Sequence, residues 1–266
     1  MFKQAIVYGL REAGLLKIAE EFRYCFELVR QYLSNRAFTR SQPNVEFPPY
    51  RLLYEVKSTT NYERYLTDGK KYAQELYKSL SPFLPEKNVT IAEWGCGVAQ
   101  VVRHLPELGR GCFSRIIGTD YDKRMIEWCM KNIRGVQFLL NELTPPLPID
   151  AGILDCLYAV SVFTHLSEEM HFAWLDEMLR VVRPKGCLVI TTMSDGSRFV
   201  LSKSELADYQ AGKLVVRGNV KEGSRLYCAY QSPVFMREKF LKGLEIIQHL
   251  PCAINREQDI WIVRAP

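Results

Sequence analysis

The sequence predicts an α/β protein with a Rossmann-like, mainly parallel seven-stranded sheet and helices on both faces of that sheet. Three observations predict this fold class. Short apolar segments alternate with amphipathic helical segments from residue 88 onward, a glycine-rich turn follows the first apolar segment, and an acidic residue ends the second. The chain has 266 residues, 47% of them apolar, which suits one such domain with an extension.

Seven short apolar runs predict the strands of this sheet. They cover residues 89–93, 115–120, 136–140, 154–160, 187–193, 244–250 and 260–263. Helical patterns lie between them, two ending near residues 107 and 132 and a third covering residues 168–182. Helices that alternate with strands connect parallel neighbours, so most of the sheet is predicted to be parallel.

Residues 1–85 are predicted to form an N-terminal helical extension or lid ahead of the main domain, residues 86–266. Helices are expected over residues 2–34 and 61–80. In the first, apolar residues recur every three to four positions, which favours packing on the core or on a second subunit, as in a possible homodimer. Binding at a membrane surface is the alternative, and it is disfavoured because four glutamates of this helix weaken attraction to anionic lipid.

Residues 194–237 break the alternation after the fifth strand and are predicted to be an insertion. A helix over residues 202–210 and a hairpin formed by residues 213–217 and 225–230 are expected within it. An insertion at this point lies near the carboxyl ends of the strands, where open α/β sheets bind their ligands. We therefore expect it to cap the ligand site.

Composition argues against several classes of partner. The net charge of +5 is spread along the chain without a dense Lys/Arg cluster, so no nucleic-acid partner is expected. No run reaches about 18 apolar residues and the N-terminus lacks a signal-peptide pattern, which predicts no membrane span and a cytoplasmic location. The four histidines are scattered without the spacing of metal ligands, so no metal site is predicted.

A glycine-rich turn joins the first predicted strand to the helix after it. The glycines Gly95 and Gly97 permit positive φ angles and a close approach of the backbone to a ligand, and the helix offers free N–H groups. Asp120 ends the second strand about 20 residues further on, where a ribose-binding acid is expected. A dinucleotide fingerprint would need a third glycine at position 100, where the sequence has Gln100. A plain strand-to-helix turn without a ligand stays an alternative for the glycines. For the acidic residue the alternative is a helix N-cap, which either Asp120 or Asp122 could provide.

Segments in the same order along residues 88–266 resemble motifs of the class I S-adenosylmethionine-dependent methyltransferase family. They are residues 93–97, 118–120, 136–143, 154–166, 180–186 and 258–264. The resemblance implies an enzyme whose cofactor is S-adenosylmethionine. It implies that this cofactor is bound by Glu93, Gly95, Cys96, Gly97, Asp120, Tyr121, Asn141, Glu142, Leu143 and Ser161. Ala99 replaces the family's third glycine, and its methyl group is expected to narrow the approach to the methionine end of the cofactor.

A closer similarity is to bacterial methyltransferases that accompany glycosyltransferases in surface-glycan or secondary-product pathways. It rests on residues 47–49, 65–69, 145–148 and 161–166. It implies a small-molecule or glycan hydroxyl as the acceptor, so the insertion at residues 194–237 would cap the acceptor side. It also implies that Tyr65 and Gly69 close over the cofactor.

A hydroxyl acceptor benefits from a base that removes its proton. His165 is the candidate catalytic base because it follows the fourth strand and histidine titrates near neutral pH, whereas packing beside the next helix or capping it is the alternative. Tyr227, Tyr230 and Gln231 are predicted to line the acceptor pocket, with a core or hairpin position as the alternative. Two other functions stay open: a catalytically silent methyltransferase fold used for binding or oligomerisation, and an RNA methyltransferase.

Overall fold

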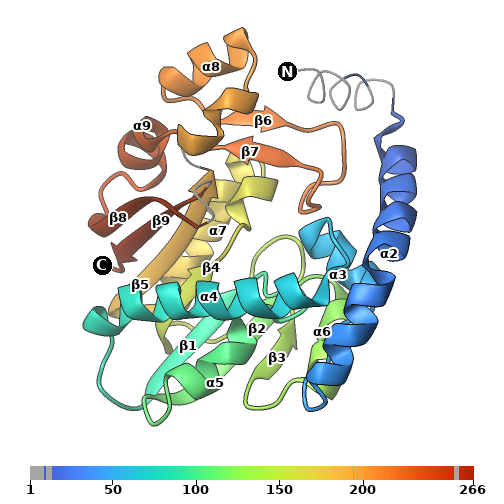
Figure 1. Ribbon diagram of the computed structural model, residues 1–266. Coiled ribbons are helices and arrows are strands. Elements are labelled where there is room, and N and C mark those ends of the chain that lie inside the picture. Colours follow the sequence, from blue (N-terminus) through green and yellow to red (C-terminus); the bar gives the residue numbers. More distant parts are fainter. Residues whose placement is uncertain (1–8, 10–13, 194, 255–257) are drawn as a thin grey trace.

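The computed structural model describes residues 9, 14–193, 195–254 and 258–266. A sheet of seven strands forms its centre, in the order β3-β2-β1-β4-β5-β9-β8 (Figure 1). Strands β1 to β5 run parallel to their neighbours, whereas β9 is antiparallel to both β5 and β8. The predicted Rossmann-like fold class is therefore confirmed.

The strands of this sheet match the predicted seven in order. They are β1 (Val89–Trp94), β2 (Phe113–Asp120), β3 (Gln137–Leu140), β4 (Leu154–Ala159), β5 (Val182–Met193), β8 (Glu245–Ile254) and β9 (Gln258–Arg264). The helices are α2 (Leu16–Ser41), α3 (Tyr50–Lys57), α4 (Tyr62–Leu80), α5 (Leu105–Leu108), α6 (Lys123–Asn132), α7 (Glu168–Val181), α8 (Lys203–Gln210) and α9 (Pro233–Phe235). Shorter turns are η1 (Ser81–Phe83), η2 (Val102–His104), η3 (Phe163–His165), η4 (Asp195–Val200) and η5 (Met236–Phe240).

Two helical predictions differ from the structure. The helix expected after the first strand, up to residue 107, is reduced to η2 and α5. The first predicted helix began at residue 2, and its first residues lie outside the described part of the chain, but α2 continues beyond the predicted end at residue 34 to Ser41. Between the fifth and sixth strands of the main sheet, α8 and the antiparallel pair β6 (Val215–Arg217) and β7 (Cys228–Tyr230) occupy the positions predicted for a helix and a hairpin.

The strand order reverses between β1 and β4. The chain passes from β1 outward to β2 and β3 and then returns to place β4 on the other side of β1. At such a reversal the connections leave in opposite directions, and a crevice forms at the carboxyl ends of the strands. The glycine turn after β1 and the turn η3 after β4 therefore both meet at this crevice.

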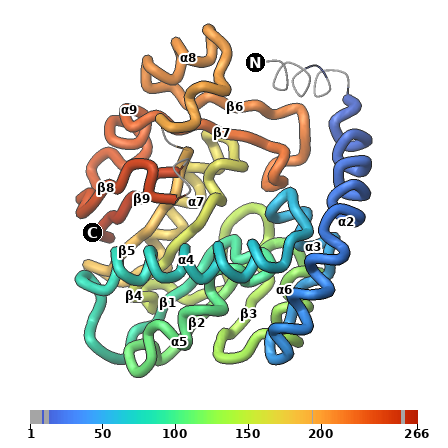
Figure 2. Tube along the Cα trace, in the orientation of Figure 1, coloured from blue at the N-terminus to red at the C-terminus, as the bar shows by residue number. Residues whose placement is uncertain are grey.

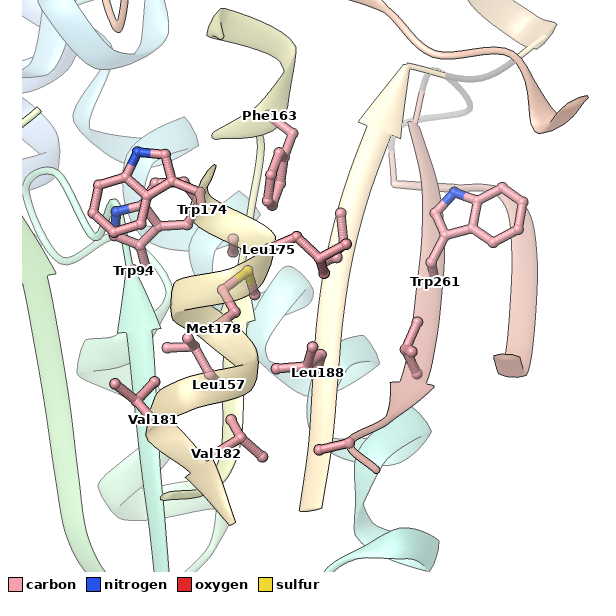
Figure 3. Close-up of a cluster of buried hydrophobic side chains, with 14 of the residues drawn as sticks. Trp94, Leu157, Phe163, Trp174, Leu175, Met178, Val181, Val182, Leu188 and Trp261 are labelled. Atoms are coloured by element: carbon pink, nitrogen blue, oxygen red, sulfur yellow. The ribbon is translucent and has the colours of Figure 1, made fainter. Parts of the chain in front are cut away.

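Alternate residues of each strand enter two separate cores, one on each face of the sheet. On one face, Leu157 of β4 and Leu188 of β5 pack with Trp174 and Met178 of α7 (Figure 3). On the other face, the neighbouring strand residues, such as Tyr158, pack with α4 and α6. Helices therefore cover both faces, as the sequence predicted.

Helix α4 braces the glycine turn from behind. The Tyr65 hydroxyl donates a hydrogen bond to the Val98 carbonyl at 2.7 Å, and the Gln100 side-chain amide donates to the Tyr65 carbonyl at 3.0 Å. Gly69 allows this close approach, because a Cβ atom there would lie 2.1 Å from the Gln100 carbonyl oxygen. Tyr65 and Gly69 therefore support the turn and do not line the cavity described below, contrary to the prediction that they close over it.

Helix α2 packs with its polar side inward. Figure 2 shows it running along one edge of the molecule, beside α3. Its buried residues include Glu27, Gln31 and Asn35, whereas Phe22 and Val29 are 75% and 81% exposed. The prediction that its apolar stripe packs on the core of the same chain is therefore wrong for the described residues.

Replacement of Gly69 by alanine tests the contact between α4 and the glycine turn. In most helices this change is stabilising, by roughly 1 kcal/mol. Here the added Cβ meets backbone, so we expect the free energy of unfolding to fall by about 2–3 kcal/mol in urea titrations. Thr67→Ala, at an exposed position of the same helix, is the control and should change little. A Gly69→Ala protein as stable as the wild type would contradict this packing.

Candidate functional site

A cavity of about 490 Å³ opens at the carboxyl ends of β1, β2 and β4. This volume is typical of sites for small molecules and cofactors. The sheet side and the turns after its strands contribute Trp94, Gly95, Gly97, Asp120, Tyr121, Asn141, Glu142, Leu143, Ser161 and His165. The opposite wall comes from α2, α3 and the segment Val220–Leu226. Most of the residues predicted to bind the cofactor are therefore brought together, although they come from four separate strand ends.

The glycine turn is tied to the end of β2. Gly95 and Gly97 have φ angles of +74° and +51°, and a Cβ on Gly95 would lie 2.4 Å from the Val162 side chain. The Gly97 N–H donates to Asp120 Oδ2 at 2.8 Å, and the Gly95 N–H donates to the Thr119 carbonyl at 2.8 Å. These contacts fix the backbone that faces the cavity.

Ala99 occupies the left-handed region, with a φ angle of +56°. This conformation costs an alanine roughly 1–2 kcal/mol relative to ordinary helical geometry. The side chain is fully buried and does not line the cavity. The departure from glycine therefore strains the turn, and the prediction that the methyl group narrows the cofactor's approach is wrong.

Asp120 accepts two backbone hydrogen bonds while facing the cavity. Gly97 N–H reaches Oδ2 and Asp122 N–H reaches Oδ1, both at 2.8 Å. Burial raises the pKa of this carboxyl to about 6. Each oxygen keeps a second acceptor position, which suits ligand hydroxyl groups. The cap of α6 is Asp122, whose Oδ1 accepts from Arg124 N–H at 2.9 Å, so Asp120 is not used as the cap.

Asn141 presents an unpaired acceptor. Its N–H donates to the Asp120 carbonyl at 3.1 Å and its side-chain NH₂ donates to the Glu142 carbonyl at 2.6 Å. Its Oδ1 is buried and has no hydrogen-bond partner among the described residues. A buried acceptor without a donor is costly, so this atom suits a ligand that brings an N–H group.

An aromatic layer supports this part of the cavity. Trp94 and Trp174 stack with ring centroids 4.1 Å apart and an angle of 29° between their planes (Figure 3). The Trp174 indole N–H donates to the Leu143 carbonyl at 3.1 Å, which fixes the loop after β3. All three residues line the cavity, so they provide an apolar surface on which a flat apolar ring of a ligand can pack.

His165 lies at the end of η3 with a defined tautomer. Its Nδ1 is 2.7 Å from the Tyr227 carbonyl oxygen, which only accepts, so Nδ1 carries the proton. The Nε2 atom therefore keeps its lone pair. Burial lowers the pKa of His165, so the ring is neutral at pH 7. Ser161, four residues earlier, has a φ angle of +61° and donates from Oγ to Gln258 Oε1 at 2.9 Å.

Two predicted cofactor residues do not line the cavity. Glu93 turns its Oε2 to Val102 N–H at 2.9 Å and to the Tyr158 hydroxyl at 3.1 Å. Cys96 is buried against the sheet, where its N–H donates to the Thr119 carbonyl. Both residues hold the glycine turn in position from beneath it.

The three predicted acceptor residues also lie away from the cavity lining. Gln231 is buried, with its amide donating to the Phe163 carbonyl at 2.9 Å and accepting from Met193 N–H at 3.2 Å. The Tyr230 ring packs under the Arg217 guanidinium. Tyr227 contributes its backbone carbonyl to His165. The alternative position, in the core and hairpin, therefore describes their side chains.

The far wall holds residues that the sequence did not indicate. The Arg225 guanidinium pairs with Glu20 of α2, donates to the Ser58 hydroxyl at 2.8 Å and lies 4.7 Å from the centre of the Tyr54 ring. Gly223 N–H donates to the His165 carbonyl at 2.9 Å. Arg225 and Glu20 are 205 residues apart, so no local pattern could have paired them.

Comparison with known proteins agrees with this geometry. Residues 92–190 match the sequence profile of the family described as "Methyltransferase domain". Malonyl-[acyl-carrier protein] O-methyltransferase of Buchnera aphidicola subsp. Baizongia pistaciae (strain Bp) is 23% identical over 168 residues, which are 62% of this chain and 64% of that protein. The chain thus spans somewhat less than two thirds of this curated relative.

Solved structures share the fold. In the complex of the Haloferax volcanii Trm112 methyltransferase activator with a methyltransferase, one chain matches with a TM-score of 0.53 and 15% identity, over 77% of this chain and 91% of that chain. Magnesium protoporphyrin IX methyltransferase of Synechocystis PCC 6803, solved with bound S-adenosylmethionine, matches with a TM-score of 0.51 and 13% identity, over 90% and 96%. The match to the methyltransferase domain is therefore shown over residues 92–190, and the solved structures confirm the fold.

Glu93 provides a pH-dependent test of the turn. Burial raises its pKa to about 8, from 4.5 in an unfolded chain. The folded state therefore retains a proton that the unfolded state loses, so stability should fall as the pH rises from 5 to 8, by at most about 1.4 kcal/mol per pH unit from this group. In the Glu93→Gln protein that loss should be absent. The free energy of unfolding of Glu93→Gln minus that of the wild type should therefore increase as the pH rises from 5 to 8.

The difference between the two urea-denaturation curves isolates Glu93 from other buried groups. Glu127→Gln, on the exposed surface of α6, serves as the control and should follow the wild type at every pH. Parallel pH dependences of wild type and Glu93→Gln would show that Glu93 is ionised in the folded protein.

Proposed function

We propose that this protein transfers the methyl group of S-adenosylmethionine to a hydroxyl group of a small molecule. The observation that carries the proposal is the pairing of Asp120 with the unpaired Oδ1 of Asn141 at the ends of two adjacent strands. A carboxylate and an amide oxygen side by side suit ribose hydroxyls and the amino group of adenine. The cavity of about 490 Å³ has room for such a ligand.

In this proposal the residues at the carboxyl ends of β1, β2 and β3 would hold the cofactor. Asp120 would accept from its ribose hydroxyls, Asn141 would accept from its adenine amino group, and Leu143 and Trp94 would pack on its apolar ring. Gly95 and Gly97 let the backbone approach, with Tyr121, Glu142 and Ser161 completing the lining. Glu93 and Cys96 act indirectly, by holding the glycine turn.

S-adenosylmethionine supplies a methyl group that is already activated on a positively charged sulfur. The chain therefore has to align an acceptor, exclude water and remove a proton. His165 suits the last task, because its Nδ1 proton is held by the Tyr227 carbonyl and its neutral Nε2 accepts a proton. The surrounding cavity wall supplies the alignment.

We further propose that residues 1–85 act as a lid and residues 194–237 as a cap on the acceptor side of the domain formed by residues 86–266. Lys17, Glu20 and Tyr54 from the first segment and Val220–Leu226 from the second form the far wall of the cavity. The contacts of Arg225 with Glu20 and Tyr54 join the two. An acceptor would then enter between them and the sheet.

The acceptor class rests on two supports of unequal weight. The curated relative is an O-methyltransferase by name, which favours an oxygen acceptor. The sequence similarity to enzymes of surface-glycan and secondary-product pathways favours a sugar or glycan hydroxyl, and this stays a prediction. The cytoplasmic location, the absence of a nucleic-acid partner and the possible homodimer also stay predictions. A silent binding module and an RNA methyltransferase remain as alternative functions.

Binding of S-adenosylmethionine, measured by calorimetry, tests the proposal first. We expect binding to the wild type and a roughly 10- to 100-fold higher Kd for Asp120→Asn, since hydrogen bonds to a charged group contribute about 1.5–3 kcal/mol. Asp176→Asn, on the exposed side of α7, should bind like the wild type. Absence of binding to the wild type at millimolar ligand would favour the silent module.

Replacement of His165 by alanine tests the proton acceptor. Polyhydroxylated sugars, phenols and carboxylic acids are screened first for methylation with S-adenosylmethionine. With the best acceptor, His165→Ala should lower kcat by about 10²–10⁴-fold and leave the Kd of the cofactor unchanged. Because burial lowers the pKa of His165, the acid limb of the wild-type rate should lie below pH 6.5. Equal kcat values for the two proteins would exclude His165 as the base.

A further inference from the structure

The side of α2 that faces away from the molecule is apolar over about four turns. We define this outer face by Ile18, Phe22, Phe26, Val29, Tyr32 and Leu33, which are between 54% and 81% exposed. Figure 1 shows α2 at the edge of the molecule, and among the described residues no helix or strand is drawn beyond it. At about 200 Å² for a large side chain, the six expose roughly 800 Å² together, which equals one partner's share of a stable interface.

The inner side of α2 explains why the apolar residues point outward. Asn35 donates from its amide to the Thr60 carbonyl at 2.7 Å and accepts from Tyr62 N–H at 2.9 Å. Glu27 accepts from the Thr59 hydroxyl at 3.1 Å. These polar contacts with the start of α4 fix the rotation of α2 about its axis, so the helix cannot turn its apolar stripe inward without losing them.

The glutamates of α2 are neutralised by partners. Glu20 pairs with Arg225, Glu21 pairs with Arg51 and Glu27 pairs with Arg30 at 2.7 Å. Each pairing cancels one negative charge that the sequence alone counted against lipid binding. The argument from these three residues therefore does not apply to the folded protein, and the fourth glutamate of the sequence argument, Glu12, lies outside the described residues.

Positive charge is left over along the same helix. Arg36 and Arg40 are exposed near its C-terminal end, beyond Leu33. Within the described part of the chain, no carboxylate lies in ion-pair distance of these two side chains. The outer face is thus an apolar stripe with unbalanced basic groups at its C-terminal end.

We propose that the outer face of α2 binds the surface of a membrane that contains anionic lipid. An apolar helical face with basic residues beside it lies in the plane of the lipid headgroups, with the apolar side chains inserted and the cations on the phosphates. A second copy of the chain fits less well, because the described glutamates of α2 are already paired and so offer the arginines of another copy no free carboxylate. No helix of the described residues is long and apolar enough to cross a bilayer, so the contact is at the surface.

Vesicle sedimentation of the full chain tests this proposal independently of methyl transfer. Vesicles of phosphatidylcholine alone are compared with vesicles that also contain phosphatidylglycerol, at low and high salt. We expect binding to the anionic vesicles at low salt, and binding weakened by high salt. The double variant Phe22→Ser/Phe26→Ser should reduce the fraction bound at least about tenfold. Arg36→Gln/Arg40→Gln should reduce it by a similar factor on anionic vesicles only.

Matched controls separate this surface from general stickiness. Phe199→Ser removes an equally exposed phenylalanine, 71% exposed, from η4, and Lys123→Gln removes an exposed cation from α6. Neither should change binding, and thermal melts verify that every variant folds. Light scattering gives the oligomeric state of each protein. Failure of the wild type to bind anionic vesicles, or binding that survives Phe22→Ser/Phe26→Ser, overturns the proposal. A dimer that this double variant dissolves, without vesicle binding, assigns the face to a second copy.

Discussion

The hydrogen bond from Gly97 N–H to Asp120 Oδ2 is the contact on which the rest of the site depends. It joins the turn after β1 to the end of β2, and these are the two places where the sheet leaves room for a ligand. Asp120 is buried and forms no ion pair with any of the described residues, and its carboxylate is stabilised by the backbone N–H groups of Gly97 and Asp122. A carboxylate held in this way is fixed in position, and its oxygens can still accept hydrogen bonds from a ligand. The same carboxylate therefore shapes the turn and is available to a ligand, which explains why its replacement should affect both.

The glycine turn itself is held from three directions. Glu93 supports it from below through Val102, α4 supports it from behind through Tyr65, and Asp120 holds its open side. This support allows Ala99 to keep a left-handed conformation that the residue alone would avoid. The strain at Ala99 is expected, because the surrounding contacts determine the path of the backbone through the turn. The turn can thus be shaped for a ligand before any ligand arrives.

The sequence was sufficient to predict the sheet and the wall of the cavity that the strand ends form. It was insufficient to predict the far wall of the cavity. Strand-length apolar runs and the positions of Gly97 and Asp120 are local signals, and each residue after a parallel strand reaches the same edge. The far wall depends on Arg225 meeting Glu20, a contact between distant segments that no spacing encodes. Tyr227 and Gln231 were predicted to line the cavity because the insertion that contains them lies near the carboxyl ends of the strands. Their direction depends on packing, and Gln231 turns inward to satisfy buried backbone groups.

Helix α2 shows how tertiary contacts can reverse the meaning of a helical pattern. Periodicity correctly indicates a helix with an apolar face, but it does not say which side faces the protein. Here Asn35 and Glu27 make the inward contacts, so the face that looks like a core surface is left outside. Because Lys17 and Glu20 of the same helix also line the cavity, the outward surface and the site share one rigid element. Any partner that binds the outer face therefore lies one helix diameter, about 10 Å, from the wall of the cavity.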